Sequence, residues 1–415
     1  MTVKPLDQKV IILGVTASIA AYKAADLASK LTQAGAIVET ILTRDAERFI
    51  SPLTFQSVTG RNAYTDTDLW GNRSHVLHVG LAHRADLMVV APASANTIAK
   101  IAHGIADNLL TLTALAICEP GLKSKIMIAP AMDGGMYLNS ATQENIDILK
   151  SRGVYFVGPE SGHLASGLVS IGRMSEPVDI VGHVRYLLTR NGPLKGKSFI
   201  ITAGGTQEPI DPVRVITNRS SGKQGFALAQ AALDKGADVL LITAPTHLNP
   251  PVGAKVIRVE TAAEMEKRVI ENSQEVDGVI MAAAVADFTP SDPASQKIKK
   301  DKNLNSIPLT PTEDILKKLA QIRSKTNMPK IVVGFAAETE DLIKNALNKL
   351  YSKNLDLIVA NNIGLTESGF GVDTNLVSLI GRDGSVESLP LMSKYDVADQ
   401  VLYRVINLLA QSMPD

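Results

Sequence analysis

Small and hydroxyl-bearing residues follow the first apolar run of the chain, in the segment Gly14–Ala20, which reads GVTASIA. Small residues allow the backbone to approach an anion closely, and the hydroxyls of Thr16 and Ser18 can donate hydrogen bonds to it. We expect a helix to begin at about Ser18, and the first turn of a helix offers unpaired N–H groups and the positive end of its dipole. The segment therefore predicts a phosphate-binding loop, although a tight turn capped by Ser18 would leave the same pattern.

Two later segments of the first half have a similar composition. Ala91–Thr97 reads APASANT, and Ala129–Tyr137 reads APAMDGGMY. None of the three segments has the Gly-x-Gly-x-x-Gly spacing of a dinucleotide site, and the second expected strand is followed by Thr43 and Arg44 rather than by an acid. A mononucleotide phosphate is therefore favoured over NAD.

Two histidines of the first half, His75 and His78, are three residues apart. This spacing places two imidazoles on one side of a helix, where they could hold a metal ion. The sequence shows no third ligand for such a site. Acid–base chemistry and simple packing between helices are the other interpretations of these histidines.

The second half carries its own anion-binding pattern. Ile201–Arg214 (ITAGGTQEPIDPVR) is followed by Asn218–Gly225 (NRSSGKQG), which leads into a helical stretch. Hydroxyls, glycines and a lysine at a helix start form a cradle for an anion, but the spacing is not that of a Walker A loop. A capped helix without a ligand would also produce the shorter of the two motifs.

A single acid, Asp287, ends the apolar segment Met281–Phe288, and a lysine run begins at Lys297. A lysine run is usually a solvated face. Here the run lies a short loop away from Asp287, an arrangement that suits Mg2+ on triphosphate oxygens with lysines facing the same charge.

The scaffold that must position these segments alternates short apolar runs with helical stretches, which predicts α/β structure with mainly parallel sheets. Ligands then lie at the carboxyl ends of the strands. In the first half we expect strands at Lys9–Leu13, Ile37–Leu42, Leu87–Ala91, Lys125–Ala129 and Val154–Val157, and helices that include Ile19–Ala34 and Thr142–Ser151. In the second half we expect strands at Ser198–Thr202, Asp238–Thr243, Lys255–Val259, Gly278–Ala282, Ile331–Gly334 and Leu357–Ala360.

The polar segment Arg190–Lys197 (RNGPLKGK) interrupts this alternation. It predicts two fused domains, 1–190 and 191–415, each with a doubly wound, three-layer sheet of flavodoxin-like or Rossmann-like type. A short hairpin is expected near the C-terminus, from Leu376–Ile380 and Ser385–Leu389 around Asp383-Gly384. We find no repeat of individual residues between the two halves.

The composition narrows the class of protein further. Forty-two basic side chains balance 42 acidic ones and aromatic residues make up 4%, so neither nucleic acid nor an anionic membrane is an expected partner. Cys118 is the only cysteine, which excludes an internal disulfide and fits a reducing compartment. Its apolar neighbours predict that it is buried in a helix. No run has the apolar length of a membrane span and the N-terminus lacks a signal-peptide pattern, so we expect a cytoplasmic protein.

With His78, the three loops of the first half resemble those of the flavoprotein decarboxylases that act on cysteine-derived carboxylates, the phosphopantothenoylcysteine decarboxylases. The resemblance implies bound FMN and matches His78 to the active-site histidine of that family. Such a flavin oxidises the substrate thiol towards a thioaldehyde, which accommodates the carbanion left by CO2. The residues that would contact FMN are Gly14, Thr16, Ser18, Thr43, Pro92, Ser94, Asn96 and Met132.

Two positions depart from the pattern of that family. Asp133 stands where the family motif has asparagine, and Ser166 stands where the best-known members carry a proton-donating cysteine. A carboxylate about 4 Å from a substrate carboxylate would be repelled by up to about 4 kcal/mol at an effective dielectric constant near 20, unless it is protonated or points elsewhere. Serine is a far weaker acid than cysteine, so the reductive half-step would need another donor or be impaired.

The second half closely resembles the phosphopantothenate–cysteine ligases, and the two halves in this order resemble the bifunctional enzymes of coenzyme A biosynthesis. In such ligases a carboxylate attacks the α-phosphorus of CTP, and the cysteine amine then displaces CMP from the acyl-cytidylate. Arg214 and Asn218 match positions that handle this intermediate, and Asp287 would hold Mg2+. The residues that would contact CTP are Met281, Ala282, Ala283, Asp287, Lys297, Pro311, Thr312, Glu313, Asp314, Phe335, Lys349 and Lys353.

The leading hypothesis is therefore a bifunctional enzyme that makes 4′-phosphopantetheine from 4′-phosphopantothenate, cysteine and CTP. Homo-oligomers are implied by the resemblance, because flavin sites of this kind form between subunits. A CTP-dependent ligase with an impaired flavin half and a ligase fused to a regulatory flavin-binding module are the alternatives. An NAD dehydrogenase is disfavoured by the missing fingerprint.

Overall fold

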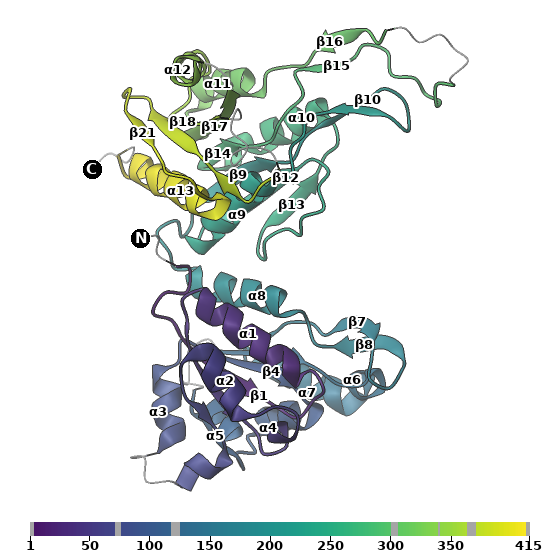
Figure 1. Cartoon of the computed structure of the whole chain (residues 1–415), viewed down its shortest axis with the longest axis vertical. Coiled ribbons are helices and arrows are strands. Elements are labelled where there is room, and N and C mark those ends of the chain that lie inside the picture. The colour runs from purple at the N-terminus through teal and green to yellow at the C-terminus, as the bar shows by residue number, and fades with distance from the viewer. Residues whose placement is uncertain are drawn as a thin grey trace. The chain divides into compact units, whose positions relative to one another are not determined.

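The computed structural model of the chain describes residues 4–70, 76–117, 125–299, 306–338, 341–362 and 371–411 (Figure 1). These residues form two compact units, one ending at Leu188 and the other beginning at Thr189. Within the described ranges, no helix is both long and apolar enough to cross a membrane. Cys118 and His75 lie outside the described residues.

The first unit is built on a six-stranded sheet in which every neighbouring pair is parallel. From edge to edge the strands are β3 (Ala63–Tyr64), β2 (Ile37–Leu42), β1 (Val10–Val15), β4 (Leu87–Ala93), β5 (Ile126–Pro130) and β6 (Tyr155–Phe156). β1 and β4 are buried over almost their whole length, because helices cover both faces of the sheet.

Two apolar clusters on opposite faces of this sheet make it the middle layer of three. One cluster joins the sheet to α1 (Ala21–Gln33), α2 (Pro52–Thr59) and α8 (Pro177–Thr189). The other joins it to α3 (Leu77–Arg84), α4 (Ala95–His103), α5 (Leu109–Ala116) and α7 (Ser140–Ser151). Outside these layers lie the short helix α6 (Gly134–Leu138) and the hairpin of β7 (Glu160–His163) and β8 (Val169–Arg173).

The second unit contains an eight-stranded sheet whose first six strands are parallel. From edge to edge the strands are β13 (Lys255–Arg258), β12 (Asp238–Thr243), β9 (Ser198–Ala203), β14 (Gly278–Met281), β17 (Ile331–Glu338), β18 (Leu357–Asn362), β20 (Val377–Gly381) and β21 (Val386–Ser388). β20 and β21 form the expected hairpin, and it extends the sheet in antiparallel fashion.

Helices cover both faces of this second sheet as well (Figure 1). α10 (Ala262–Asn272), α11 (Ile315–Thr326) and α12 (Leu342–Ser352) pack on one face. α9 (Lys223–Asp234) and α13 (Lys394–Gln411) pack together and contact the strands from the other face. Three small antiparallel ladders complete the unit, namely β10 (Gln207–Pro209) with β11 (Val215–Thr217), β15 (Phe288–Pro290) with β16 (Leu309–Pro311), and β19 (Thr374–Asn375) with β22 (Met392–Ser393).

An aspartate ties the two central strands together at the amino edge of each sheet. In the first unit Asp86 accepts the backbone N–H of Val10 (2.8 Å) and lies 3.5 Å from the ammonium of Lys9. In the second unit Asp277 accepts the backbone N–H of Ser198 (3.0 Å) and lies 3.2 Å from the ammonium of Lys197. The two units therefore carry an equivalent lysine and aspartate at this edge, although their sequences show no repeat of individual residues.

The fold class predicted from the sequence is confirmed, since both units are three-layer α/β structures on mainly parallel sheets. The expected helix start at Ser18 is wrong, because α1 begins at Ala21. Residues 18–20 form a turn in which the N–H of Ala20 binds the hydroxyl of Ser18 (3.2 Å). The ladders β10–β11 and β15–β16 were not expected, because strands of three residues leave no periodic pattern.

Gly225 is the point of closest approach between α9 and β9, and we predict that its substitution destabilises the second unit. A Cβ at this position would lie 2.5 Å from Cβ of Ala203 and 2.7 Å from the carbonyl oxygen of Thr202. Gly225→Ala should therefore lower the free energy of unfolding by about 1–3 kcal/mol, measured by denaturant unfolding. Gly80→Ala in α3, where a Cβ meets no atom within 4 Å, is the control and should stabilise its unit by about 0.5–1 kcal/mol. Equal effects of the two substitutions would contradict the prediction.

Candidate functional sites

In each sheet the strand order reverses direction at one place, between β1 and β4 in the first unit and between β9 and β14 in the second. Loops that leave two such strands diverge to opposite faces, and the crevice between them is where open α/β sheets bind ligands. The sequence-predicted phosphate loops Gly14–Ala20 and Ala91–Thr97 follow β1 and β4. The loops that follow β9 and β14 contain Gly204–Thr206 and Ala282–Asp287.

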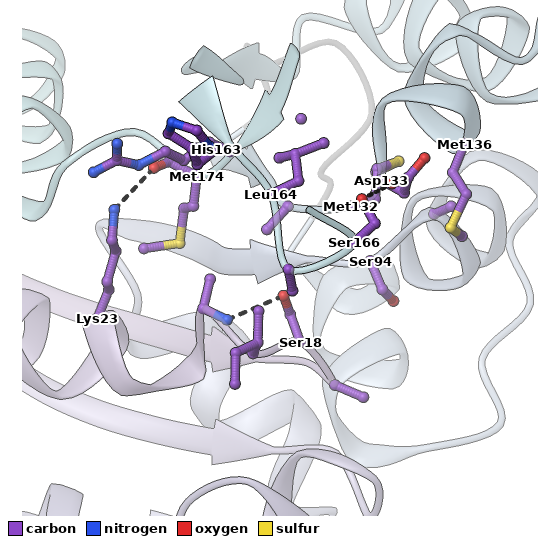
Figure 2. A pocket seen from close by; sticks show the side chains of 18 of the residues that line it. Ser18, Lys23, Ser94, Met132, Asp133, Met136, His163, Leu164, Ser166 and Met174 are labelled. Atoms are coloured by element: carbon purple, nitrogen blue, oxygen red, sulfur yellow. Dashed lines mark hydrogen bonds between the residues drawn. The ribbon is translucent and has the colours of Figure 1, made fainter. Parts of the chain in front are cut away.

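A cavity of about 540 Å³ opens at the carboxyl edge of the first sheet (Figure 2). It lies among the loops after β1, β4 and β5, the start of α1, and the hairpin β7–β8. Five of the predicted site residues line it, namely Ser18, Ser94, Met132, Asp133 and Ser166. Its volume lies within the range of small-molecule and cofactor sites, and Ile19, Leu164 and Met174 give it an apolar lining.

The hydroxyl of Thr16 joins the two loops that flank this cavity. It donates to the carbonyl oxygen of Pro92 (2.8 Å) and accepts the N–H of Ser94 (2.9 Å), and the side chain is buried. Thr16 and Pro92 are therefore internal supports of the site, and neither is part of the cavity lining.

Backbone N–H groups at two places on the cavity rim can donate hydrogen bonds to an anion. Those of Ala17, Ser18 and Ile19 have no hydrogen-bond partner within the described part of the chain. Ser94 caps α4, where its hydroxyl accepts the N–H of Thr97 (3.3 Å), and the adjacent exposed Asn96 lies in the first turn of that helix. The combination is the one expected of a phosphate cradle.

The side chains of Asp133 and Ser166, the two departures from the family pattern, bind each other. The Ser166 hydroxyl donates to Oδ2 of Asp133 (2.7 Å), and Oδ1 of Asp133 accepts the N–H of Gly135 (3.0 Å) at the start of α6. These hydrogen bonds, the one from Ser166 foremost, hold the pKa of Asp133 below its ordinary value. In the protein without ligands these hydrogen bonds therefore favour the ionised form of Asp133. Its hydrogen bonds stabilise the fold above the ordinary carboxyl pKa and lose that effect as the pH falls through the lowered one.

A cluster of charged residues that the sequence analysis missed lies on another wall of the cavity, near the labelled side chains of Lys23, His163 and Met174 (Figure 2). The buried ammonium of Lys23 donates to Glu176 (2.8 Å) and to the carbonyl oxygen of Met174 (3.3 Å), and Arg173 contacts the same carboxylate. Lys23, and to a lesser degree Arg173, hold the pKa of Glu176 below its ordinary value. Lys23 has the sequence context of an ordinary helix position, so nothing local marked it.

Besides Thr16, Pro92 and Asn96, three further predicted residues of the first unit lie outside the cavity lining. Gly14 is inside β1, where a Cβ would lie 2.9 Å from the side chain of Leu110, so its small size serves packing. Thr43 accepts the N–H of Ala46 (3.3 Å) in the loop after β2. His78 is half-buried in the first turn of α3, a helix that Arg84 holds to Glu39 of β2 (3.0 Å).

In the second unit, a buried threonine and an asparagine shape the loop after β14. The hydroxyl of Thr202 accepts the N–H groups of Ala282 (3.1 Å) and Ala283 (3.0 Å). The side-chain amide of Asn218 donates to the carbonyl oxygens of Ala284 and Val285, both at 3.2 Å. The exposed Asn218, which was predicted to handle the acyl intermediate, thus also fixes the loop after β14.

The predicted nucleotide loops converge beside this segment. Thr312 donates its N–H to the carbonyl oxygen of Asp287 (2.9 Å) and its hydroxyl to that of Ala286 (2.6 Å). Asp314 caps α11 through the N–H of Lys317 (3.2 Å) and forms an ion pair with Lys353 (3.2 Å). The Pro311–Asp314 segment thus connects the loop that carries the exposed carboxylate of Asp287 to Lys353.

The remaining predicted residues of the second unit lie on other strands, helices and loops of that unit. Met281 ends β14 and pairs with Gly334, so Phe335 of β17 lies one residue further towards the same edge. Lys349 lies in the last turn of α12, and Glu313 forms an ion pair with Lys318 (3.4 Å). Lys297 is exposed in the segment between β15 and β16, where Arg214 binds the carbonyl oxygen of its neighbour Ile298 (2.9 Å).

The lysine of the SSGKQG motif, which was predicted to help form the anion cradle, is paired with an acid of the same unit. Lys223 donates to Asp373 (2.7 Å) and to the carbonyl oxygen of Gly371 (2.9 Å), and it holds the pKa of Asp373 below its ordinary value. These partners lie about 150 residues further along the chain, so the motif alone did not reveal them. Among the described residues, no group of three or more histidine, cysteine or acidic side chains could hold a metal ion.

The two halves of the chain match two protein families. Residues 2–189 match the Flavoprotein family, and residues 194–409 match the DNA/pantothenate metabolism flavoprotein C-terminal domain. The coenzyme A biosynthesis bifunctional protein CoaBC of Bacillus subtilis (strain 168) is 45% identical over 410 residues, which cover 98% of this chain and 99% of that protein. CoaBC of Vibrio cholerae serotype O1 is 42% identical over 402 residues, or 96% and 98% of the two chains. A crystal structure of a CoaBC C-terminal domain is 40% identical and covers 54% of this chain and all of that chain, with a TM-score of 0.46.

A flavoprotein unit joined to a pantothenate-metabolism unit defines a two-part metabolic enzyme. The identity over nearly the full length of its relatives is more specific. The chain belongs to the family of coenzyme A biosynthesis bifunctional proteins, as the resemblance of its motifs predicted.

We predict that removing the Thr16 hydroxyl destabilises the first unit. Thr16→Val keeps the side-chain shape and leaves the carbonyl oxygen of Pro92 and the N–H of Ser94 without their buried partner. The free energy of unfolding should fall by about 1–3 kcal/mol, measured by denaturant titration. Thr43→Val, which loses one partly buried hydrogen bond, is the matched control and should lower the free energy of unfolding by less than Thr16→Val does. A Thr16→Val protein as stable as the wild type would show that the two loops do not depend on this hydroxyl.

Proposed function

We propose that this enzyme makes 4′-phosphopantetheine from 4′-phosphopantothenate, cysteine and CTP, with decarboxylation in the first unit (1–190) and ligation in the second (191–415). The observation that carries the proposal is the presence of two sites in one chain whose relatives over the full length are coenzyme A biosynthesis bifunctional proteins. Each site lies where the strand order of its sheet reverses.

FMN is the cofactor that we propose for the cavity of the first unit. The family is that of flavoproteins, the cavity of about 540 Å³ is of cofactor size, and its apolar lining suits an aromatic ring system. Ser18, Ser94 and the free N–H groups of Ala17–Ile19 would hold the phosphate. The flavin supplies the oxidation that makes loss of CO2 possible, and the chain supplies position and charge.

The second unit would bind CTP on the loops after β14 and β16. The hydroxyl of Thr202 fixes the backbone of Ala282 and Ala283, and Thr312 attaches the Pro311–Asp314 segment to Asp287. Mg2+ would be held by Asp287 and the phosphates of CTP, since this ion usually takes one or two carboxylates together with phosphate oxygens. Lys297, Lys349 and Lys353 would offset the phosphate charge, and Asn218 and Arg214 would contact the acyl-cytidylate.

We also propose that the enzyme is a cytoplasmic homo-oligomer in which a second copy completes the flavin site. His78 is absent from the lining of the cavity, although the family resemblance makes it an active-site residue. Apolar side chains that line the cavity are more than half exposed, as at Ile19 (62%), Tyr22 (65%) and Met136 (52%). A partner subunit would cover them and supply its own histidine. Sedimentation of the intact protein as a monomer would contradict this arrangement.

The alternative of a ligase with an impaired flavin half is not favoured. Asp133 and Ser166 motivated it, but they satisfy each other's hydrogen-bonding groups and leave the cavity open. Oδ1 of Asp133 also accepts a hydrogen bond from the N–H of Gly135, which stabilises the negative charge of the carboxylate. The same full-length identity argues against a regulatory flavin module.

The proposal is tested by supplying the purified enzyme with 4′-phosphopantothenate, cysteine and CTP, and by following pyrophosphate and CO2 separately. Both products should form, and CO2 should also form from added phosphopantothenoylcysteine without CTP. Lys297→Gln should slow pyrophosphate release about tenfold or more without affecting that second reaction. Pyrophosphate without CO2 would overturn the decarboxylase assignment, and no pyrophosphate would overturn the ligase assignment.

We predict that Asp133 and Ser166 are coupled in the reductive step. A cysteine at 166 would be a stronger acid than serine, but the adjacent Asp133 carboxylate would raise the pKa of its thiol and weaken it as a donor. Ser166→Cys should therefore increase formation of the saturated thiol product by less than the double variant Asp133→Asn/Ser166→Cys does. Independent effects of the two substitutions on product formation would show that the hydrogen bond between the side chains has no catalytic consequence.

A further inference from the structure

Asp211 occupies the turn between β10 and β11 and has no solvent-exposed side-chain surface. Its Oδ1 accepts the backbone N–H groups of Val213 and Arg214, both at 2.9 Å. These two bonds shape the turn, and an uncharged side chain with a carbonyl oxygen could form them equally well.

The second carboxylate oxygen of Asp211 binds a segment more than eighty residues away. Oδ2 accepts the backbone N–H of Ile298 (3.1 Å) and the Nε–H of Arg214 (2.9 Å), and a terminal nitrogen of Arg214 contacts it closely. The same terminal nitrogen donates to the carbonyl oxygen of Ile298 (2.9 Å). Both backbone groups of Ile298 are thus held, and Ala294 donates a further bond to the carbonyl oxygen of Ile210 (3.0 Å).

A full negative charge is needed for this arrangement, because three N–H donors converge on one oxygen. The guanidinium of Arg214, followed by the backbone N–H groups, holds the pKa of Asp211 far below its ordinary value. Arg214 is oriented by the pairing, and 45% of its side-chain surface remains exposed towards solvent. The guanidinium can therefore contact a substrate while it binds Asp211.

We infer that Asp211 is a positioning residue of the ligase reaction, which fixes Arg214 and the Lys297 segment as one assembly. The inference rests on the proposed function, which assigns Lys297 to the triphosphate of CTP. Lys297 is exposed and precedes Ile298 directly, so its backbone lies next to the held residue. Holding that backbone reduces the number of positions that the long, flexible lysine side chain can take, and prior positioning of a charged group lowers the barrier of the reaction that it serves.

Asp211→Asn tests the attachment of the Lys297 segment without removing the hydrogen bonds that shape the turn. Asparagine keeps an oxygen for the N–H groups of Val213 and Arg214 but places an NH2 group opposite the donors of Ile298 and Arg214. Asp356→Asn is the matched control, because Asp356 is also buried and also binds an arginine, Arg323 (2.9 Å), and a backbone N–H, that of Val332 (2.8 Å). It precedes β18, at the amino edge of the sheet and away from the proposed site.

Two measurements on the intact enzyme test the inference. Trypsin should cleave after Lys297 and Lys299 at least about fivefold faster in Asp211→Asn than in the wild type or in Asp356→Asn, as read by mass spectrometry. The kcat/KM for CTP in pyrophosphate release should fall at least about tenfold. CO2 release from added phosphopantothenoylcysteine should stay unchanged, because the other unit carries it out.

A double substitution decides whether Asp211 acts through the lysine segment. In a Lys297→Gln background, Asp211→Asn should cause little further loss of kcat/KM, and a fully additive loss would overturn the inference. Unchanged cleavage, or faster cleavage with unchanged kcat/KM, would also overturn it. If Asp211→Asn does not fold, Arg214→Lys is the second variant. It keeps the positive charge but loses the two-pronged contact with Asp211, and trypsin should again cleave the Lys297 segment faster than in the wild type. A wild type without CTP-dependent activity would refute the proposed function, and the trypsin result would still report on the attachment of the segment.

Discussion

In each unit the two strands that flank the site are tied together at both ends, and the geometry of the site depends on these ties. At the amino edges Asp86 and Asp277 accept the first N–H of the neighbouring strand. At the carboxyl edges the hydroxyls of Thr16 and Thr202 bind the loop that follows the other strand. Adjacent strands lie about 4.8 Å apart, so loops held in this way start from a fixed separation and converge on one ligand. The loops of both sites can then be irregular in conformation and still have a fixed position.

Much of this framework could be predicted from the sequence, because buried parallel strands are continuous apolar runs and ligand loops follow them. Ser18, Ser94, Met132 and Asp133 lie in loops selected on that basis, Ser166 was identified from the family resemblance, and all five line one cavity. The contacts that could not be predicted join residues far apart in the chain. Lys23 meets Glu176, Lys223 meets Asp373, and Asp211 meets Ile298. Such pairs leave no local pattern, since either partner alone looks like an ordinary surface residue.

The hydrogen bond between Asp133 and Ser166 shows why single positions mislead when they are compared with a family pattern. Taken separately, the aspartate adds a charge to an anion site and the serine removes an acid. Together they satisfy each other, and they attach the loop between β7 and β8 to the start of α6. The apparent loss of a donor is thus also the gain of a contact that holds one wall of the cavity.

The aspartates at the amino edges have a consequence for how such proteins can be altered. Asp86 and Asp277 lie at the far end of six-residue strands, roughly 20 Å from the loops that carry the chemistry. The loops can therefore be exchanged while the strand pairs and their aspartates are kept, and one type of scaffold can carry a different site in each unit of the chain. To give this enzyme a new ligand, the loops at the carboxyl edge should be changed and the residues at the amino edge should be kept.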